Sequence, residues 1–361
     1  MVLAVVFASA SIQGPDLTSI RRNLMPVPES VRFRGTPLPI DRTFTVALRG
    51  PSGPASPRVY RAALRLLERL GRQTGISIPI ETSLGSDRAT LLIEHFESVP
   101  GVQRAIEDES YTLEVDAAGA ALRAPTPYGV LRGIETFLQL VEVAVPATAV
   151  AAVDRPSTIP DLEPEPEDFI VPGVEIRDVP RFPWRGLLID PGRHFLSIDV
   201  MKRNLDAMAA VKLNVLHWHL SEDQGFRVES RIFPKLHELG SGGFYYTQDE
   251  IQDLVAYGRD RGIRVMPEFD MPGHATSWFV GYPELASAPG PYEIIETWGI
   301  QDPSMDPTRD ETYEFLGAFI AEMAALFPDN YFHIGGDEVN GNQWNGNPDI
   351  QAFISEQGLE D

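Results

Sequence analysis

Hydrophobic residues recur with helical spacing in two segments of the first part of the chain, residues 57–71 and 128–141. Other segments of this part alternate apolar and polar residues, which is typical of half-buried strands. These predicted strands cover residues 76–80, 89–96, 111–115 and 120–124, the last two forming a hairpin. The pattern predicts a small α+β domain over residues 24–142, with one sheet and its helices on one face.

The periodicity changes after residue 182, where continuous apolar runs alternate with helical patterns. The predicted strands cover residues 186–190, 213–220, 263–270 and 331–334, and the predicted helices cover 197–211, 247–261 and 312–327. No phosphate-binding glycine motif follows the first strand, which disfavours a nucleotide-binding sheet. The alternation predicts an α/β fold, a (β/α)8 TIM-type barrel of which residues 182–361 supply about the first four units.

Residues 143–181 separate the two predicted domains, and residues 143–168 are rich in Ala, Val, Pro, Glu and Asp. The stiff acidic piece at 164–168 indicates a solvated linker or surface insertion, with a ligand-binding loop as the alternative. Residues 1–23 start with a short apolar run ending in Ala8-Ser9-Ala10, which is similar to a signal-peptidase site. We expect export to the periplasm or beyond, although no Lys or Arg precedes the run; a frayed N-terminus is the alternative.

The charge of the chain narrows the classes of partner. The 361 residues carry 52 Asp and Glu against 30 Lys and Arg, a formal net charge of −22. Such a charge repels polyanions, so nucleic acid is not expected as a partner. The chain has no cysteine, which excludes disulfides and thiolate chemistry. No later segment is long and apolar enough to predict a transmembrane helix.

Potentially reactive side chains follow each predicted strand of the second domain, in residues 190–194, 217–223, 268–274 and 333–338. A barrel gathers its strand ends into one cleft, so these segments predict a functional site. In the last segment, Gly335-Gly336 permits a sharp turn before Asp337 and Glu338. Two neighbouring carboxylates in a cleft cannot both ionise freely, which gives a proton donor beside an anion. Cleavage of a sugar bond needs such a pair; two solvated acids in a turn are the alternative.

Four ordered motifs of the second domain resemble family 20 of the glycoside hydrolases, the β-N-acetylhexosaminidases. They are RGLLID with RHF at 185–195, KLNVLHWHL at 212–220, PEFDMPGH at 267–274 and HIGGDE at 333–338. The domain before them resembles the small α+β domain that precedes the barrel in that family. The resemblance implies removal of terminal non-reducing β-linked GlcNAc or GalNAc from oligosaccharides or glycoconjugates, without a cofactor or a metal.

The resemblance also implies roles for the paired carboxylates. Glu338 would be the general acid that protonates the glycosidic oxygen and later activates water. Asp337 would hold and polarise the 2-acetamido group of the substrate. The carbonyl oxygen of that group attacks the anomeric carbon and gives an oxazolinium intermediate, with retention of configuration. A nucleophile that belongs to the substrate needs only orientation, which a carboxylate can supply.

Three further positions of the site follow from the resemblance. Arg193 would bind hydroxyls of the sugar ring, with a salt bridge to Asp190 as the structural alternative. His274 would lie behind the general acid, coupled to an acidic residue after the second strand. That residue is Glu222, where the family commonly has Asp, or its neighbour Asp223.

Two functions of other classes remain open. A metal-dependent hydrolase would use His217 and His219, which lie two apart on one strand face, together with His274 and Asp337. A non-catalytic sugar-binding protein is the second alternative, because only four of eight barrel units are visible.

The visible units predict an incomplete barrel. We therefore expect a fragment of a longer protein that exposes sheet edges, folds poorly or lacks activity. In the family, later strands carry the tryptophans that surround the sugar. Trp344 follows Glu338 too closely to be assigned to them.

Overall fold

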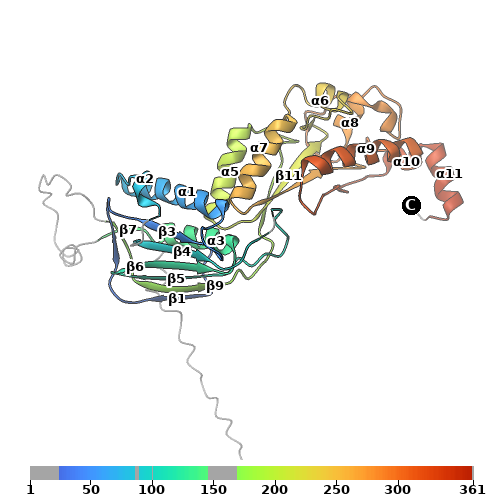
Figure 1. Ribbon diagram of the computed structural model, residues 1–361. Coiled ribbons are helices and arrows are strands. Elements are labelled where there is room, and N and C mark those ends of the chain that lie inside the picture. Colours follow the sequence, from blue (N-terminus) through green and yellow to red (C-terminus); the bar gives the residue numbers. More distant parts are fainter. Residues whose placement is uncertain (1–23, 86–88, 100, 145–168, 360–361) are drawn as a thin grey trace, which may run out of the picture.

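The computed structural model describes residues 24–85, 89–99, 101–144 and 169–359, and the predicted signal segment at 1–23 lies outside them. The first domain is built on a six-stranded sheet (Figure 1). Its strands lie in the order β1 (Ser30–Phe33), β9 (Val174–Asp178), β5 (Tyr111–Asp116), β6 (Gly119–Ala124), β4 (Leu91–His95) and β3 (Val46–Arg49). β4 pairs in parallel with β3 and β6, and the remaining neighbours are antiparallel.

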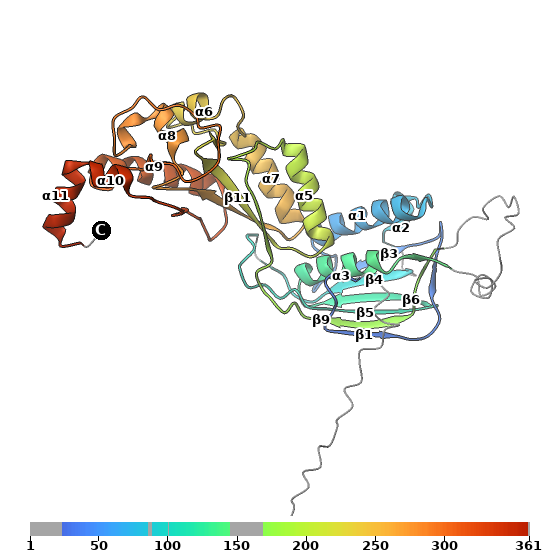
Figure 2. The ribbon, with the colours of Figure 1, turned by 180° about the vertical axis from the view of Figure 1, so that it is seen from behind.

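Helices α1 (Pro57–Thr74) and α3 (Pro127–Gln139) cover one face of this sheet (Figures 1 and 2). Buried residues alternate with exposed ones along β5 and with partly buried ones along β6, which follows from that one-sided cover. α3 is buried on nearly all sides, because it also contacts α5 (Ile198–Ala210) of the second domain. The predicted hairpin and the predicted α+β layer are therefore confirmed.

Three local predictions for the first part of the chain are wrong. Residues 76–79 form no strand, and α2 (Ile80–Ser83) begins where one was expected. Pro79 has no N–H for a sheet, and its carbonyl accepts from the N–H groups of Thr82 and Ser83 instead. Helix α1 continues past Gly71 to Thr74 and is capped by Gly75, whose φ of 70° lies in the left-handed region.

The predicted linker at 143–181 needs the third correction. Residues 145–168 lie outside the described residues, but β8 (Phe169–Val171) pairs with β2 (Leu38–Ile40) and β7 (Glu142–Val143) in a small sheet. β9 then enters the main sheet between β1 and β5. The first domain therefore includes the end of the segment that was assigned to the linker. Apolar residues at alternate positions of β9 are buried there against the helices.

The second domain places parallel strands side by side in chain order, as the first part of a TIM-type barrel does. β10 (Gly186–Ile189), β11 (Val215–Glu222) and β13 (Arg264–Phe269) pair in parallel, and β12 (Gly225–Phe226) pairs with the end of β11. The predicted helices are α5, α7 (Gln248–Asp260) and α9 (Asp310–Leu326). The shorter helices are α6 (Lys235–Gly240), α8 (Thr276–Gly281), η1 (Pro283–Leu285), α10 (Asn342–Gly346) and α11 (Pro348–Gln357).

The predicted fourth strand is reduced to a single parallel bridge between His333 and Glu268. The N–H of His333 donates to the carbonyl of Pro267, and the N–H of Met271 donates to the carbonyl of Ile334. The extended pairing stops there because the next residue, Gly335, has a φ of 72°. The segment still lies next to β13, where a fourth barrel strand belongs.

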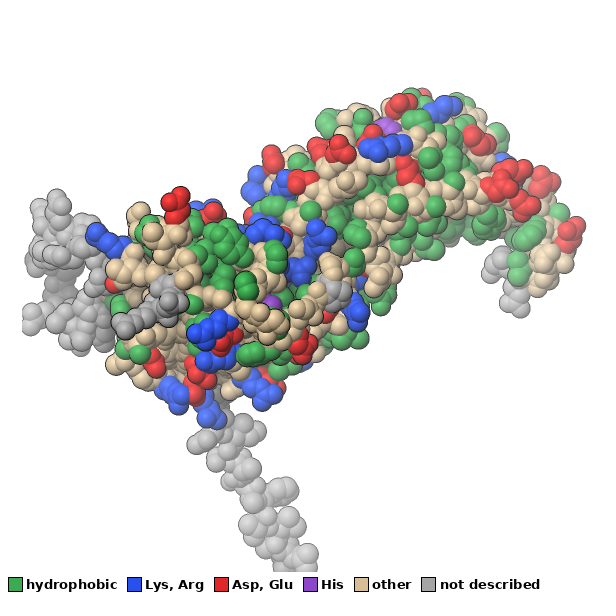
Figure 3. All heavy atoms as spheres, viewed as in Figure 1, with side chains coloured by type: hydrophobic (Ala, Val, Ile, Leu, Met, Phe, Trp, Pro, Cys, Tyr) green, Lys and Arg blue, Asp and Glu red, His purple; other side chains and the backbone are tan. Residues whose placement is uncertain are grey.

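The two domains have separate hydrophobic cores and are joined by buried ion pairs. Glu109 is buried between Arg132 of α3 and Arg185, which precedes β10. Figure 3 shows Lys and Arg side chains gathered over the junction, where Arg61 and Arg65 of α1 both pair with Asp260 of α7.

The barrel strands leave apolar side chains open to solvent along part of their length. Leu188 on β10 is 52% exposed and Ile334 is 53% exposed, as was expected for an incomplete barrel. Within the described residues, no helix is both long and apolar enough to cross a membrane.

Candidate active site

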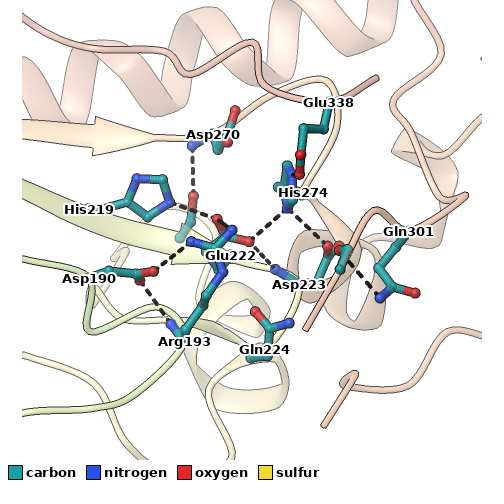
Figure 4. Close-up of polar contacts among 12 residues, drawn as sticks. Asp190, Arg193, His219, Glu222, Asp223, Gln224, Asp270, His274, Gln301 and Glu338 are labelled. Atoms are coloured by element: carbon teal, nitrogen blue, oxygen red, sulfur yellow. Dashed lines mark hydrogen bonds and ion pairs between the residues drawn. The ribbon is translucent and has the colours of Figure 1, made fainter. Parts of the chain in front are cut away.

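The ends of the barrel strands bring acidic and basic side chains from four separate segments into one network (Figure 4). Asp190 and Arg193 follow β10, and Glu222 ends β11. His274 follows β13 on the loop before α8, and Glu338 follows the turn at Gly335-Gly336. The predicted gathering of strand ends is therefore present in the fold.

Glu222 is at the centre of this network and is almost completely buried. Its Oε1 lies 3.0 Å from Nε2 of His219 and 2.7 Å from Nη2 of Arg193. Its Oε2 lies 3.0 Å from Nδ1 of His274. Burial alone would raise the pKa of Glu222, but the hydrogen bonds from the two histidines and the charge of Arg193 lower it to about 2. Glu222 is therefore a buried anion surrounded by donors.

His274 contacts both acids that the sequence left as alternatives. Besides Glu222, its Nδ1 lies 3.3 Å from Oδ2 of Asp223. The other oxygen of Asp223 accepts from the N–H and the hydroxyl of Thr276, which fixes that carboxylate. Hydrogen bonds to Asp223 and Glu222 raise the pKa of His274 to about 11 despite its burial.

Glu338 lies on the open side of His274. Its Oε2 is 3.1 Å from Nε2 of His274, and about half of its side chain is exposed. The turn before it requires glycine, because a Cβ on Gly335 would lie 1.7 Å from Oδ1 of Asp270. Glu338 itself has a φ of 49°, which only a minority of residues other than glycine adopt. The backbone thus aims this carboxyl at both the histidine and the solvent.

Asp337 has different neighbours from Glu338. It is exposed, and its carboxylate oxygens come within 4.8 Å of those of Glu268 and Asp270. Asp270 is buried, accepts a hydrogen bond from the N–H of Gly336 at 2.8 Å, and has one oxygen without a partner. Burial raises the pKa of Asp270 to about 6, although the hydrogen bond from Gly336 lowers it. Asp337 and Glu338 are adjacent in sequence, but Asp337 lies near Glu268 and Asp270 whereas Glu338 contacts His274.

Arg193 makes the predicted salt bridge to Asp190, at 2.7 Å from its Nη1, and also contacts Glu222. Its side chain remains 43% exposed at the mouth of the network. Gly192 beside it lets the backbone pass close to Glu222, because a Cβ on Gly192 would lie 2.9 Å from Cβ of Glu222. Arg193 therefore forms the salt bridge to Asp190 and also lies beside the network.

Glu268 and Asp270 lie in the predicted site segment 268–274, but the sequence did not single them out as site residues. Glu268 is buried at the end of β13 and contacts three histidines, His217, His219 and His333. The signal that would have found the two acids is their spacing, because residues two apart on a strand share a face.

The set required by a metal-dependent hydrolase is not brought together. His217 and His219 both contact Glu268, whereas His274 contacts Glu222, Asp223 and Glu338. Both ring nitrogens of His219 face carboxylates, Glu268 at 2.5 Å and Glu222 at 3.0 Å. A histidine that donates from both nitrogens has no lone pair left for a metal. The geometry therefore favours proton chemistry over metal ligation at this position.

Trp344 contacts the segment before α9. Its indole N–H donates to the carbonyl of Met305 at 2.9 Å, which anchors α10. This contact explains the tryptophan as a packing residue of the barrel periphery.

Comparison with known proteins places both domains in one family. Residues 21–179 match domain 2 of glycosyl hydrolase family 20, and residues 182–361 match its catalytic domain. A β-hexosaminidase of Porphyromonas gingivalis is 32% identical over 349 residues, which cover 94% of this chain and 42% of that protein. The chain therefore spans less than half the length of this relative.

Solved structures give the same result. The chitobiase of Flavobacterium johnsoniae superimposes with a TM-score of 0.83 and 38% identity, covering 95% of this chain and 49% of that one. An exo-β-N-acetylglucosaminidase of Vibrio harveyi, solved with N-acetylglucosamine, gives a TM-score of 0.73 and 28% identity. The match covers 94% of this chain and 50% of that one. With both domains matched in order and the motif residues joined in one network, the chain is a member of glycoside hydrolase family 20.

Proposed function

We propose that this chain carries the acid–base part of a β-N-acetylhexosaminidase site, which removes terminal non-reducing N-acetylhexosamine by substrate-assisted retaining catalysis. The observation that carries the proposal is the contact of His274 with Glu338, at 3.1 Å, beside the separate carboxylate of Asp337. The half-exposed position of Glu338 leaves it accessible to a glycosidic oxygen. The N-acetylglucosamine in the Vibrio harveyi structure supports this substrate class.

In the first step, Glu338 gives its proton to the glycosidic oxygen as the bond to the anomeric carbon breaks. The carboxylate that forms faces the Nε2 atom of His274, so a hydrogen bond from that nitrogen stabilises the new negative charge. In the second step the same carboxylate takes a proton from water. The water attacks the oxazolinium ion, and Glu338 returns to its acid form.

Asp337 orients the nucleophile of the substrate. Its carboxylate would accept the amide N–H of the 2-acetamido group, which directs the carbonyl oxygen at the anomeric carbon. Burial disfavours a charge on the neighbouring Asp270, which limits repulsion between the two acids. The exposed part of Arg193 would donate to ring hydroxyls, and its other N–H groups hold Asp190 and Glu222.

The proposal is tested by release of nitrophenol from 4-nitrophenyl N-acetyl-β-glucosaminide by the full-length gene product, with Glu338→Gln and Asp337→Asn beside it. We expect turnover that persists after treatment with a chelator and falls steeply in Asp337→Asn. It should fall less in Glu338→Gln, because nitrophenolate can leave without a proton. Glycan binding without turnover, unchanged in Glu338→Gln, would instead support a sugar-binding protein. Activity that disappears with the chelator would support a metal-dependent hydrolase.

A further inference from the structure

A continuous chain of polar contacts runs from the interior of the barrel to Glu338, and Figure 4 shows its members from His219 onward. It starts at Glu268, whose Oε2 lies 2.5 Å from Nδ1 of His219. Nε2 of His219 lies 3.0 Å from Glu222, and Glu222 lies 3.0 Å from Nδ1 of His274. Nε2 of His274 reaches Glu338 at 3.1 Å. Acids and imidazoles alternate at every step, and only the last member is substantially exposed.

The alternation determines where the protons lie. An ionised carboxylate only accepts hydrogen bonds, so each ring nitrogen that faces one must carry a hydrogen. His219 faces Glu268 on one side and Glu222 on the other, so the imidazolium form is the one that donates to both ionised carboxylates. Burial alone would lower the pKa of His219, yet its hydrogen bonds to Glu222 and Glu268 raise it to about 10.

We propose that His219 is a positioning residue for the proton donor, acting through Glu222 and His274 with Glu268 as its anchor. This inference rests on the proposed role of Glu338. His219 supplies one of the N–H groups that keep Glu222 ionised and hold its carboxylate in place. Glu222 in turn fixes the Nδ1 hydrogen of His274, which leaves the Nε2 side of that ring directed at Glu338.

The charge of His219 also acts on Glu338. With a neutral residue in its place, Glu222 loses a donor and accepts the Nδ1 proton of His274 more readily. The network then carries one positive charge fewer, so the site as a whole should release its proton at higher pH. The charged and titratable groups that surround His219 are Asp190, Arg193, His217, Glu222, Glu268, Asp270, His274 and His333.

The test is the pH profile of kcat/KM for His219→Gln. A glutamine amide can still donate to one carboxylate but carries no charge. We expect kcat to fall about 10- to 100-fold, the size known for groups that orient a metal-binding histidine through a hydrogen bond. The alkaline limb should move up by roughly one pH unit, the size expected for a unit charge several ångströms away. His217→Gln is the matched control, because His217 contacts Glu268 but does not contact Glu222.

A second variant covers the case in which His219→Gln does not fold. Glu268→Gln removes a negative charge from the same chain, so its alkaline limb should move down instead of up. The inference would be overturned if a folded variant kept the alkaline limb of its kcat/KM profile in place and lost activity equally at every pH. A limb that moves equally in His217→Gln would also overturn it.

A readout without catalysis separates this inference from the proposed function. Nitrogen-15 NMR of labelled histidines in the unmodified protein should show both ring nitrogens of His219 protonated at pH 8. A neutral His219 at that pH contradicts the inference whatever the activity. A protein that has the doubly protonated ring but no glycosidase activity contradicts the proposed function of Glu338, and with it the catalytic consequence drawn for His219.

Discussion

The Nε2 atom of His219 lies 3.0 Å from Oε1 of Glu222, although the two residues are three apart on the same strand. In a regular strand, residues three apart face opposite sides of the sheet. The pairing of β11 with β13 shifts between His219 and Ser221, so Leu220 is an extra residue on β11. This bulge turns Glu222 to the side of His219, which is how one strand supplies two members of the network.

Glu338→Gln should affect substrates according to their leaving group. A sugar alkoxide must be protonated as it leaves, whereas nitrophenolate is stable as an anion. We expect kcat on chitobiose to fall about 10²- to 10⁴-fold, the usual contribution of a general acid. The loss on the nitrophenyl glycoside should be clearly smaller. Measurement of both rates on one preparation checks this, and equal losses on the two substrates would exclude Glu338 as the acid.

Gly335→Ala should destabilise the protein by more than the strain of placing an alanine at a positive φ. The new Cβ would lie 1.7 Å from Oδ1 and 2.7 Å from Cα of Asp270, so the backbone would have to move. Gly35 is the matched control, because its φ of 75° resembles the 72° of Gly335 and nothing lies within 4 Å of its Cβ position.

The difference between these two alanine variants isolates the clash from the backbone strain that they share. We expect Gly335→Ala to lower the free energy of unfolding by about 1–3 kcal/mol more than Gly35→Ala, as overpacking usually does. Denaturant unfolding of both variants measures this difference. Equal losses would show that the turn can move away from Asp270 without cost.

Much of this site could be predicted from the sequence, because strand ends in a barrel converge whatever the loops do. The convergence of the segments that carry Arg193, His274 and Glu338 follows from that rule, whereas the choice of these three residues came from the resemblance to the family. The bulge at Leu220 could not be predicted, since a single extra residue is specified by pairing with β13 and not by local pattern. The choice between Glu222 and Asp223 was undecidable for the same reason, and both contact His274.

In the fold, too, local patterns were predicted correctly and pairings between distant segments were not. The hairpin at β5 and β6 was predicted correctly because alternation and a short turn are local signals. β9 was missed because it follows a segment rich in Pro and acidic residues, and its partners β1 and β5 are distant in sequence. The strand at 76–80 was predicted on alternation alone, which the missing N–H of Pro79 outweighs.

Asp270→Asn should change the pH dependence of stability. The pKa of Asp270 is raised from its ordinary 3.8 to about 6, so between these values the folded state binds more protons than the unfolded state. Stability contributed by this group is therefore present at low pH and is lost as the pH rises through 6. Asparagine stays neutral and keeps an oxygen for the N–H of Gly336.

The free energy of unfolding of Asp270→Asn, relative to the unmodified protein, should therefore increase between pH 4 and pH 7. The shift corresponds to a gain on the order of 2–3 kcal/mol. Denaturant unfolding at both pH values checks this. Parallel stability curves for the two proteins would mean that Asp270 ionises in the fold as it does in water.

Glu109→Ala should destabilise the junction between the domains. Glu109 is 4% exposed and pairs with Arg132 at 2.8 Å and with Arg185, and it also accepts from Asn214 at 3.3 Å. Removal of its carboxylate leaves two guanidinium groups with little access to water and without their anion. Breaking a buried pair in this way costs about 3–5 kcal/mol.

Glu29→Ala is the control for Glu109→Ala, because Glu29 pairs with Arg177 at 3.7 Å and both side chains are more than half exposed. Solvent screens such a pair, so its loss should change the free energy of unfolding by less than about 1 kcal/mol. If Glu109→Ala is no more costly than the control, water must enter the junction and solvate Arg132. Because Arg132 also donates to the carbonyl of Gly262 after α7, an opened junction would release α3 from the barrel helices, which hydrogen exchange at α3 would detect.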